Sequence, residues 1–287
     1  MDNINHILSK ELGISLKQVT SVIEMLDEGN TVPFIARYRK ERTGGLTDEV
    51  LRKFNERLTY LRNLESRKED VLRIIEEQEK LTPELKLKIE KATTLTEVED
   101  IYRPFKAKKR TRATMAVEKG LKPLAELILS GEFNGDIVEE ANKYINEEKG
   151  VKNEEEALQG AMDIISEIIS DNADYRKWIR NFVQKDGIIQ VKGSSEEQTP
   201  YEMYYDYKEP VRTIPSHRIL AINRGEKEKI LSVKVTCNDD IIIDYLNKKV
   251  LKGNKITDKY LEESIKDSFK RLIYPSIERE IRSELTS

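Results

Sequence analysis

Hydrophobic residues recur at three- and four-residue steps through the long N-terminal part of the chain, which is the spacing of an amphipathic helix. Ser15 and Gln18 form a capping-box pattern ahead of one such run, and Thr96 and Glu99 repeat it further along. Pro33 suits the first turn of another helix, FIARYRKER, which a glycine pair ends. The pattern predicts a succession of helices with defined starts and stops.

The longest predicted helix begins at Thr47 and continues for roughly 35 residues, which corresponds to about 50 Å. About halfway along, its apolar residues shift to a neighbouring face of the helix. Glu65 and Lys68 take stripe positions there, while Leu64 and Val71 lie beside the stripe. Such a helix can act as a strut or as one arm of an antiparallel helical hairpin, and the pattern leaves both open.

The periodicity changes after Gly187. Residues 188–192 are expected to form a strand, and residues 230–237 alternate between apolar and polar positions. Residues 201–215 are rich in tyrosine and proline and show no period. We therefore expect a mainly α, elongated multi-helix scaffold with a small antiparallel β element near residues 188–245. The expected parts are a helical domain at 1–187, a small mixed α/β segment at 188–253 and a C-terminal helix at 254–287.

Two helices are expected in the C-terminal part of the chain. Ser216 can cap a short one that ends at Gly225, and Thr257 opens the last one, with a kink at Pro275. The last helix carries an apolar stripe that needs a partner. We expect self-association or disorder near the C-terminus. The stripe comprises Leu261, Ile265, Phe269, Leu272, Ile273, Ile277, Ile281 and Leu285.

Composition supports a helical, soluble protein. The 287 residues include 50 basic and 53 acidic side chains, a formal net charge of −3, and 38% are hydrophobic. This mixture is too apolar for a disordered chain and suits helices with solvated charged faces. The longest apolar run, Ile219–Ile222, is four residues, so no membrane span is expected. The N-terminus does not resemble a signal peptide, which favours a cytoplasmic protein.

No motif for catalysis or cofactor binding is found. The sequence contains no phosphate-binding loop, no GxGxxG and no GxSxG, and its two histidines, His6 and His217, lie far apart. The single cysteine excludes an intrachain disulfide and a cysteine-rich zinc site. Asp239 and Asp240 are adjacent, which favours a turn over a metal site. We expect no enzymatic activity, no catalytic residue, no cofactor and no metal.

Two basic clusters stand out from this background. The first comprises Arg37, Arg39, Lys40 and Arg42, with Tyr38 between them. The second lies within ten residues that include no acid, and comprises Arg103, Lys106, Lys108, Lys109, Arg110 and Arg112. Such cations can contact nucleic-acid phosphates, or they can pair with glutamates of neighbouring helices. The residues alone leave these two interpretations equal.

Three longer stretches resemble a known family. They are VPFIARYRKERTGGLTDEV at 32–50, IYRPFKAKKRTRATMAVEKGLKPLA at 101–125 and VRTIPSHRILAINRGEKEKIL at 211–231. In content, order and spacing they are similar to the bacterial Tex family of transcription accessory proteins. The resemblance covers nearly the whole chain.

The resemblance implies a cytoplasmic, nucleic-acid-binding factor linked to transcription, similar to the core of a eukaryotic elongation factor. In that family a helical scaffold with a helix-turn-helix-like region precedes a ribonuclease-H-like domain, helix-hairpin-helix modules and an RNA-binding barrel. This sequence stops at Ser287, before those domains, so we expect it to be a portion of a longer protein. A function of the missing barrel cannot be assigned to these residues.

Our first hypothesis is a non-enzymatic, nucleic-acid-binding transcription accessory factor, of which this chain is the scaffold portion. It would bind RNA or DNA weakly through the two basic clusters. The alternative is a protein-interaction scaffold that docks on an acidic partner such as RNA polymerase without contacting nucleic acid.

Overall fold

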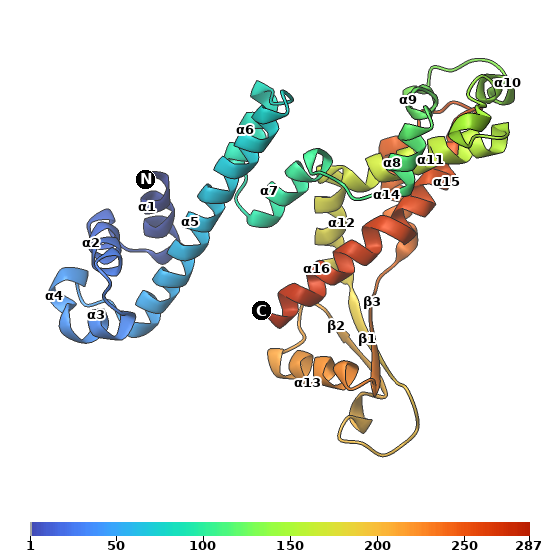
Figure 1. Cartoon of the computed structure of the whole chain (residues 1–287). Coiled ribbons are helices and arrows are strands. Elements are labelled where there is room, and N and C mark those ends of the chain that lie inside the picture. The colour runs from blue at the N-terminus through green and yellow to red at the C-terminus, as the bar shows by residue number, and fades with distance from the viewer. Residues whose placement is uncertain (1) are drawn as a thin grey trace. The chain divides into compact units, whose positions relative to one another are not determined.

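The computed structural model describes residues 2–287, which form two compact units (Figure 1). The first unit ends at Glu99, and the second covers Asp100–Ser287. The expected boundary at residue 187 falls inside the second unit. The division of the chain into three parts stays a prediction.

The first unit is entirely helical among its described residues. The Ser15–Gln18 capping box is present at its second helix, and Thr47 caps its longest. The helices are α1 (Asp2–Leu12), α2 (Leu16–Asp27), α3 (Val32–Tyr38), α4 (Lys40–Thr43), α5 (Asp48–Glu77), α6 (Pro83–Lys91) and the start of α7 (Leu95–Tyr102). Four residues connect α2 to α3, a length that suits a helix-turn-helix motif, but the motif itself stays a prediction.

The phase change in α5 has a structural explanation. The buried stripe passes through Leu64, Lys68 and Val71, and the Lys68 side chain is only 6% exposed. Its Nζ donates a hydrogen bond of 2.8 Å to the carbonyl oxygen of Glu90 on α6, which satisfies the buried ammonium. Because α6 follows α5 directly and Lys68 meets Glu90, α6 folds back along α5. The long helix is therefore one arm of a hairpin.

Two sequence expectations in this unit are wrong in detail. The single helix expected from Pro33 is broken at Arg39, whose backbone leaves helical geometry (φ −131°) and separates α3 from α4. The cap lies two residues earlier than Thr96 suggested, and the reciprocal bond runs from the Thr93 amide to Glu97, so it is not a regular capping box. Thr94 Oγ1 accepts a hydrogen bond from the Glu97 amide at 3.1 Å, because α7 already begins at Leu95.

The second unit is built around α11 (Glu154–Asp171), which packs against α8, α9, α10 and α15. Gly160 allows one of these contacts, because a Cβ there would meet Leu121 at 2.2 Å. The other helices are α8 (Arg112–Glu118), α9 (Lys122–Ser130), α10 (Ile137–Asn142), α12 (Ala173–Asp186), α13 (Ser216–Lys227), α14 (Asp239–Val250), α15 (Asp258–Asp267) and α16 (Tyr274–Thr286). Short 3-10 turns are η1 (Arg103–Phe105), η2 (Glu147–Lys149) and η3 (Glu202–Tyr204).

A three-stranded antiparallel sheet confirms the expected small β element in a mainly α fold (Figure 1). Its order is β2-β1-β3, with β1 at Ile188–Gly193, β2 at Asp206–Pro210 and β3 at Leu231–Thr236. Val191 on the central strand pairs with Tyr207 on β2 and with Val233 on β3. The sequence pattern missed β2, because DYKEP has little apolar alternation and none of its residues is fully buried.

Gly225 does not end a helix, contrary to expectation. It lies inside α13, which continues to Lys227 and packs on β3. A Cβ at Gly225 would meet Leu231 Cδ1 at 2.5 Å, so the glycine allows helix and strand to approach closely. Asp239 and Asp240 likewise form no simple turn. They occupy the first turn of α14, an unexpected helix, where carboxylates interact favourably with the helix dipole.

The expectation for the last helix is also wrong. Leu261, Ile265, Ile273 and Ile277 are fully buried, and the segment packs against α11, α12, α13 and α14 of its own unit. The stripe therefore has its partner within the chain, and nothing in the structure supports self-association through it. A π-helical turn, η4 (Ser268–Ile273), joins α15 to α16 directly ahead of Pro275.

Small residues bring this segment close to α11. Ser166 donates a hydrogen bond of 3.1 Å to the Ser264 carbonyl, and Ser268 donates one of 2.6 Å to the Ser166 carbonyl. All three serines are buried, so these bonds satisfy polar groups that would otherwise be unpaired. Among the helices that the structure describes, none combines the length and apolarity needed to cross a bilayer.

Candidate nucleic-acid interface

The second basic cluster starts at η1, crosses a loop and enters the first turn of α8. Its six cations fall into two groups. Arg103 and Lys108 are held by polar contacts within the second unit. The others are exposed, and their side chains form no hydrogen bond or ion pair with any residue of the described range 2–287. These four, which we call the free cations, are Lys106, Lys109, Arg110 and Arg112.

Lys108 anchors the loop to α11. Its Nζ forms ion pairs with the carboxylates of Glu167 and Asp171 in the last turns of that helix. Burial raises the pKa of Asp171, and the hydrogen bond from Lys108 opposes that rise. A second anchor follows, because Thr111 Oγ1 donates a hydrogen bond of 2.9 Å to Glu167 while Thr111 caps α8 with Thr114. The loop is therefore fixed at two points.

The free cations lie before, between and after these anchors. Lys106 precedes Lys108, and Lys109 and Arg110 lie between the two anchors. Arg112 is close enough to Asp267 to help lower the pKa of that carboxyl, after the larger effect of Arg271. Lys106, Lys109 and Arg110 are thus the cations most available to an external anion.

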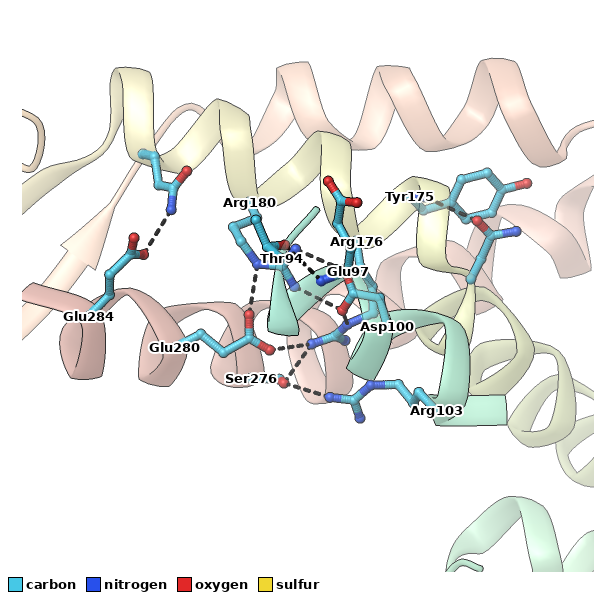
Figure 2. A network of polar contacts seen from close by, with 12 residues as sticks. Thr94, Glu97, Asp100, Arg103, Tyr175, Arg176, Arg180, Ser276, Glu280 and Glu284 are labelled. Atoms are coloured by element: carbon cyan, nitrogen blue, oxygen red, sulfur yellow. Dashed lines mark hydrogen bonds and ion pairs between the residues drawn. The ribbon is translucent and has the colours of Figure 1, made fainter. Parts of the chain in front are cut away.

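A buried network of arginines and carboxylates holds the chain next to Arg103, where the basic segment begins (Figure 2). Arg180 on α12 donates two hydrogen bonds of 2.9 Å to Asp100 on α7, and its Nε donates to Glu280 on α16 at 2.8 Å. Asp100 is 4% exposed. Burial lowers the pKa of Arg180, but the carboxylates of Asp100 and Glu280 more than offset this, so the pKa is raised. These bonds tie three helices together.

Arg176, one turn earlier on α12, completes the network. Its side chain is fully buried and forms ion pairs with Asp100 at 3.5 Å and Glu280 at 3.1 Å. It also donates a hydrogen bond of 2.7 Å to Ser276, which accepts a second one of 3.2 Å from Arg103. Burial and the nearby Arg103 lower the pKa of Arg176. Arg176 and Arg180 thus share the carboxylates of Asp100 and Glu280, and Arg103 joins the network through the Ser276 hydroxyl.

Sequence reasoning missed most of this network. The available signal was the four-residue spacing of Arg176 and Arg180, which places both on the same face of α12 as Ile179 and Val183. Arginines on an apolar face need buried acceptors. Neighbouring residues in the sequence do not reveal these acceptors, because Asp100 and Glu280 lie 80 and 100 residues from Arg180.

The first basic cluster lies in the other unit, on α3 and α4. Arg42 forms an ion pair of 3.5 Å with Glu24 on α2. The Arg37 guanidinium lies 5.4 Å from the centre of the Tyr38 ring, and that of Arg39 lies 5.1 Å from the centre of the Phe34 ring. Lys40 is exposed. The sequence pointed to the cations and Tyr38 but not to Phe34, although the two aromatic residues are four positions apart.

Comparison with known proteins agrees with the resemblance. The model of the Tex-like protein N-terminal domain matches residues 2–76, and that of the Tex central region-like family matches residues 134–287, more than half of the chain. YdcI of Bacillus subtilis (strain 168) is 49% identical over 97% of this chain and 40% of its own length. The transcriptional accessory protein Tex of Neisseria gonorrhoeae is 40% identical over 99% of this chain and 38% of its own.

A human relative is more distant. The S1 RNA-binding domain-containing protein 1 of Homo sapiens is 29% identical over 98% of this chain and 30% of its own length. The chain thus spans at most about two fifths of the length of these curated relatives.

Proposed function

Because this chain belongs to the Tex family of transcription accessory proteins, we propose that it is the helical scaffold portion of a nucleic-acid-binding transcription accessory factor. In this proposal the chain has no enzymatic activity and works in the cytoplasm. Its direct contribution is a weak, sequence-independent contact between the loop of residues 106–112 and the phosphates of a single strand.

The free cations are the observation that carries this proposal. Lys106, Lys109 and Arg110 point their charge at solvent with no partner among the described residues, while Lys108 and Thr111 hold the loop in place. Phosphates of a nucleic acid attract such cations, because binding releases the counterions condensed on the strand. A loop fixed beforehand loses little conformational entropy when it binds.

The ligand class has indirect support. One relative carries RNA binding in its name, which is a property of that protein. Within residues 2–287 we recognise no element that reads base edges in a groove, so we propose contact with the backbone and no sequence preference. An acidic protein partner is the competing occupant of the same loop, and the experiment below separates the two.

The test is a salt titration of single-stranded RNA binding. A loop engaging about four phosphates gives a slope near −2.8 in log K against log salt, at ~0.7 per phosphate. Dissociation constants of about 10⁻⁴–10⁻⁶ M are expected at physiological salt. Replacing Lys106, Lys109 and Arg110 by serine removes about three contacts and should flatten the slope by roughly 2.

The control is a variant with the same loss of charge elsewhere. Lys185, Lys208 and Lys227 are exposed residues of the second unit, and replacing all three by serine should leave the slope unchanged. If the loop variant binds single-stranded RNA with the affinity and slope of the unsubstituted chain, the loop does not contact phosphates. In that case docking on an acidic protein becomes the better explanation of the free cations.

A further inference from the structure

Two aromatic side chains on α3 are unusually exposed. Tyr38 is 54% exposed and Phe34 is 36% exposed, whereas Ile35 between them is fully buried. Their ring centres are 5.2 Å apart and their planes are tilted by 48°. Ile35 is the buried residue of this helix, so it supplies the contact with the core while the exposed parts of the two rings remain open to a ligand.

Each ring is accompanied by an arginine. The guanidinium of Arg37 lies over the Tyr38 ring and that of Arg39 over the Phe34 ring, at 5.4 and 5.1 Å from the ring centres. Neither arginine forms an ion pair within the described part of the chain. Guanidinium groups are planar and weakly hydrated, so they stack on flat π systems more readily than lysine does.

The backbone beneath this patch is firmly held. Thr43 at the end of α4 is fully buried, and its carbonyl accepts a hydrogen bond of 2.9 Å from Gln18 on α2. The Arg42–Glu24 ion pair joins the same two helices. Arg39 NH1 donates a hydrogen bond of 3.0 Å to the Tyr38 carbonyl at the break between α3 and α4. The backbone next to the aromatic and guanidinium groups is therefore held in place.

We propose that Phe34, Arg37, Tyr38 and Arg39 form a base-stacking site for single-stranded nucleic acid. Exposed aromatic rings and arginines bind unpaired bases through their π faces, whereas the bases of a duplex already stack on one another. The inference rests on the proposed function for its class of ligand. It differs in that this site recognises the base, while the loop of residues 106–112 recognises the phosphate.

The test compares two single-stranded dodecamers of equal charge, one of uridines and one of abasic ribose phosphates. The chain with K106S/K109S/R110S is used, so that the loop contributes little. Stacking of one base on an aromatic side chain is worth ~1–3 kcal/mol, so the uridine strand should bind about tenfold more tightly than the abasic strand. Tyr38→Phe keeps a flat ring and should preserve this ratio. Tyr38→Leu keeps only apolar bulk and should bring the ratio toward 1.

Equal affinity for the two strands in the chain with an intact Tyr38 overturns the stacking site. It leaves the phosphate contact standing if the loop substitutions still flatten the salt slope. In the reverse result, the loop substitutions leave the salt slope unchanged, while the chain prefers the uridine strand and Tyr38→Leu abolishes that preference. This result supports the stacking site and contradicts the loop contact. If Tyr38→Leu weakens both strands by the same factor with unchanged helix content, the residue does not act through bases and the proposal fails. R37K/R39K keeps the charge and should also reduce the uridine preference.

Discussion

Replacing Asp100 by asparagine tests whether the buried charge network stabilises the second unit. The side chain is almost fully buried and accepts both guanidinium bonds of Arg180, while Arg176 lies 3.5 Å away. Asparagine fits the space but removes the charge, so Glu280 becomes the only carboxylate that pairs with Arg176 and Arg180. Breaking a buried ion pair in this way typically costs about 3–5 kcal/mol, and we expect a loss of unfolding free energy in that range.

Urea unfolding followed by tryptophan fluorescence measures this loss. Trp178 is the only tryptophan in the sequence and lies on α12, between the two arginines. The matched control is Asp267→Asn, because Asp267 pairs with Arg271 near the surface and its loss should cost at most about 1 kcal/mol. If Asp100→Asn costs no more than this control, the network does not stabilise the unit.

A second substitution tests the charge imbalance itself. Replacing Arg176 by methionine in the Asp100→Asn background removes one surplus cation, so the double variant should be more stable than the sum of the two single changes predicts. Strictly additive free energies would show that Asp100 and Arg176 act independently, which the shared contacts argue against.

Three other substitutions test features of the second unit. Lys108→Ser should destabilise the unit more at pH 8 than at pH 5, measured by urea unfolding at both pH values. Burial holds the pKa of Asp171 above its value in the unfolded chain, so the free energy of unfolding falls as the pH rises through the folded-state pKa. Removing Lys108 takes away the hydrogen bond that opposes this rise in pKa, so the variant should lose more stability over the same pH range. Gly160→Ala should cost about 1–3 kcal/mol in thermal unfolding, since its Cβ would overlap Leu121. Ile277→Ala should cost about 2–5 kcal/mol in urea unfolding, because the side chain is fully buried.

Each of these has an outcome that contradicts it. A pH-independent effect of Lys108→Ser would mean that Asp171 does not depend on this ion pair. An alanine at Gly160 that raises the melting temperature would show that α11 can move away from Leu121. An Ile277→Ala variant that unfolds like the unsubstituted chain would indicate that the stripe of the last helix is not packed in solution.

The sequence predicted the elements whose signals are local. The Ser15 capping box, the Thr47 cap and the alternating strand near residue 233 were all recognised from neighbouring residues. It failed where distant segments decide the outcome. One partner of the terminal stripe is α11, about a hundred residues earlier, as the Ser166–Ser268 bond shows. No periodicity within the last helix reveals such a partner.

The candidate interface shows the same limit. All six cations of the second cluster were visible in the sequence. The distinction between Lys108, which is neutralised, and Lys109, which is free, depends on carboxylates about sixty residues away. Adjacent lysines with the same local surroundings thus have different roles. Charge density can be counted from a sequence, but the charge that remains after folding cannot.

The π-helical turn η4 sets the rotational phase of the last helix. The buried stripe keeps a strict four-residue spacing across it: Leu261, Ile265, Phe269, Ile273, Ile277 and Ile281. In a regular α-helix a four-residue step overshoots a full turn by about 40°, so such a stripe would wind steadily around the helix. A π turn holds more residues and reverses that drift once, midway along the stripe.

Deleting one residue from η4 would therefore leave the buried face of α16 nearly unchanged. The wide turn holds about one residue more than the same stretch of α-helix, so the shortened turn can become regular α-helix while Ser276 and Glu280 stay near the arginines of α12. Deleting one residue between Ser276 and Glu280, where the helix is already regular, would instead rotate everything after it by about 100° and carry Glu280 away from those arginines. The last helix should accordingly tolerate a single-residue deletion inside η4 far better than one inside α16.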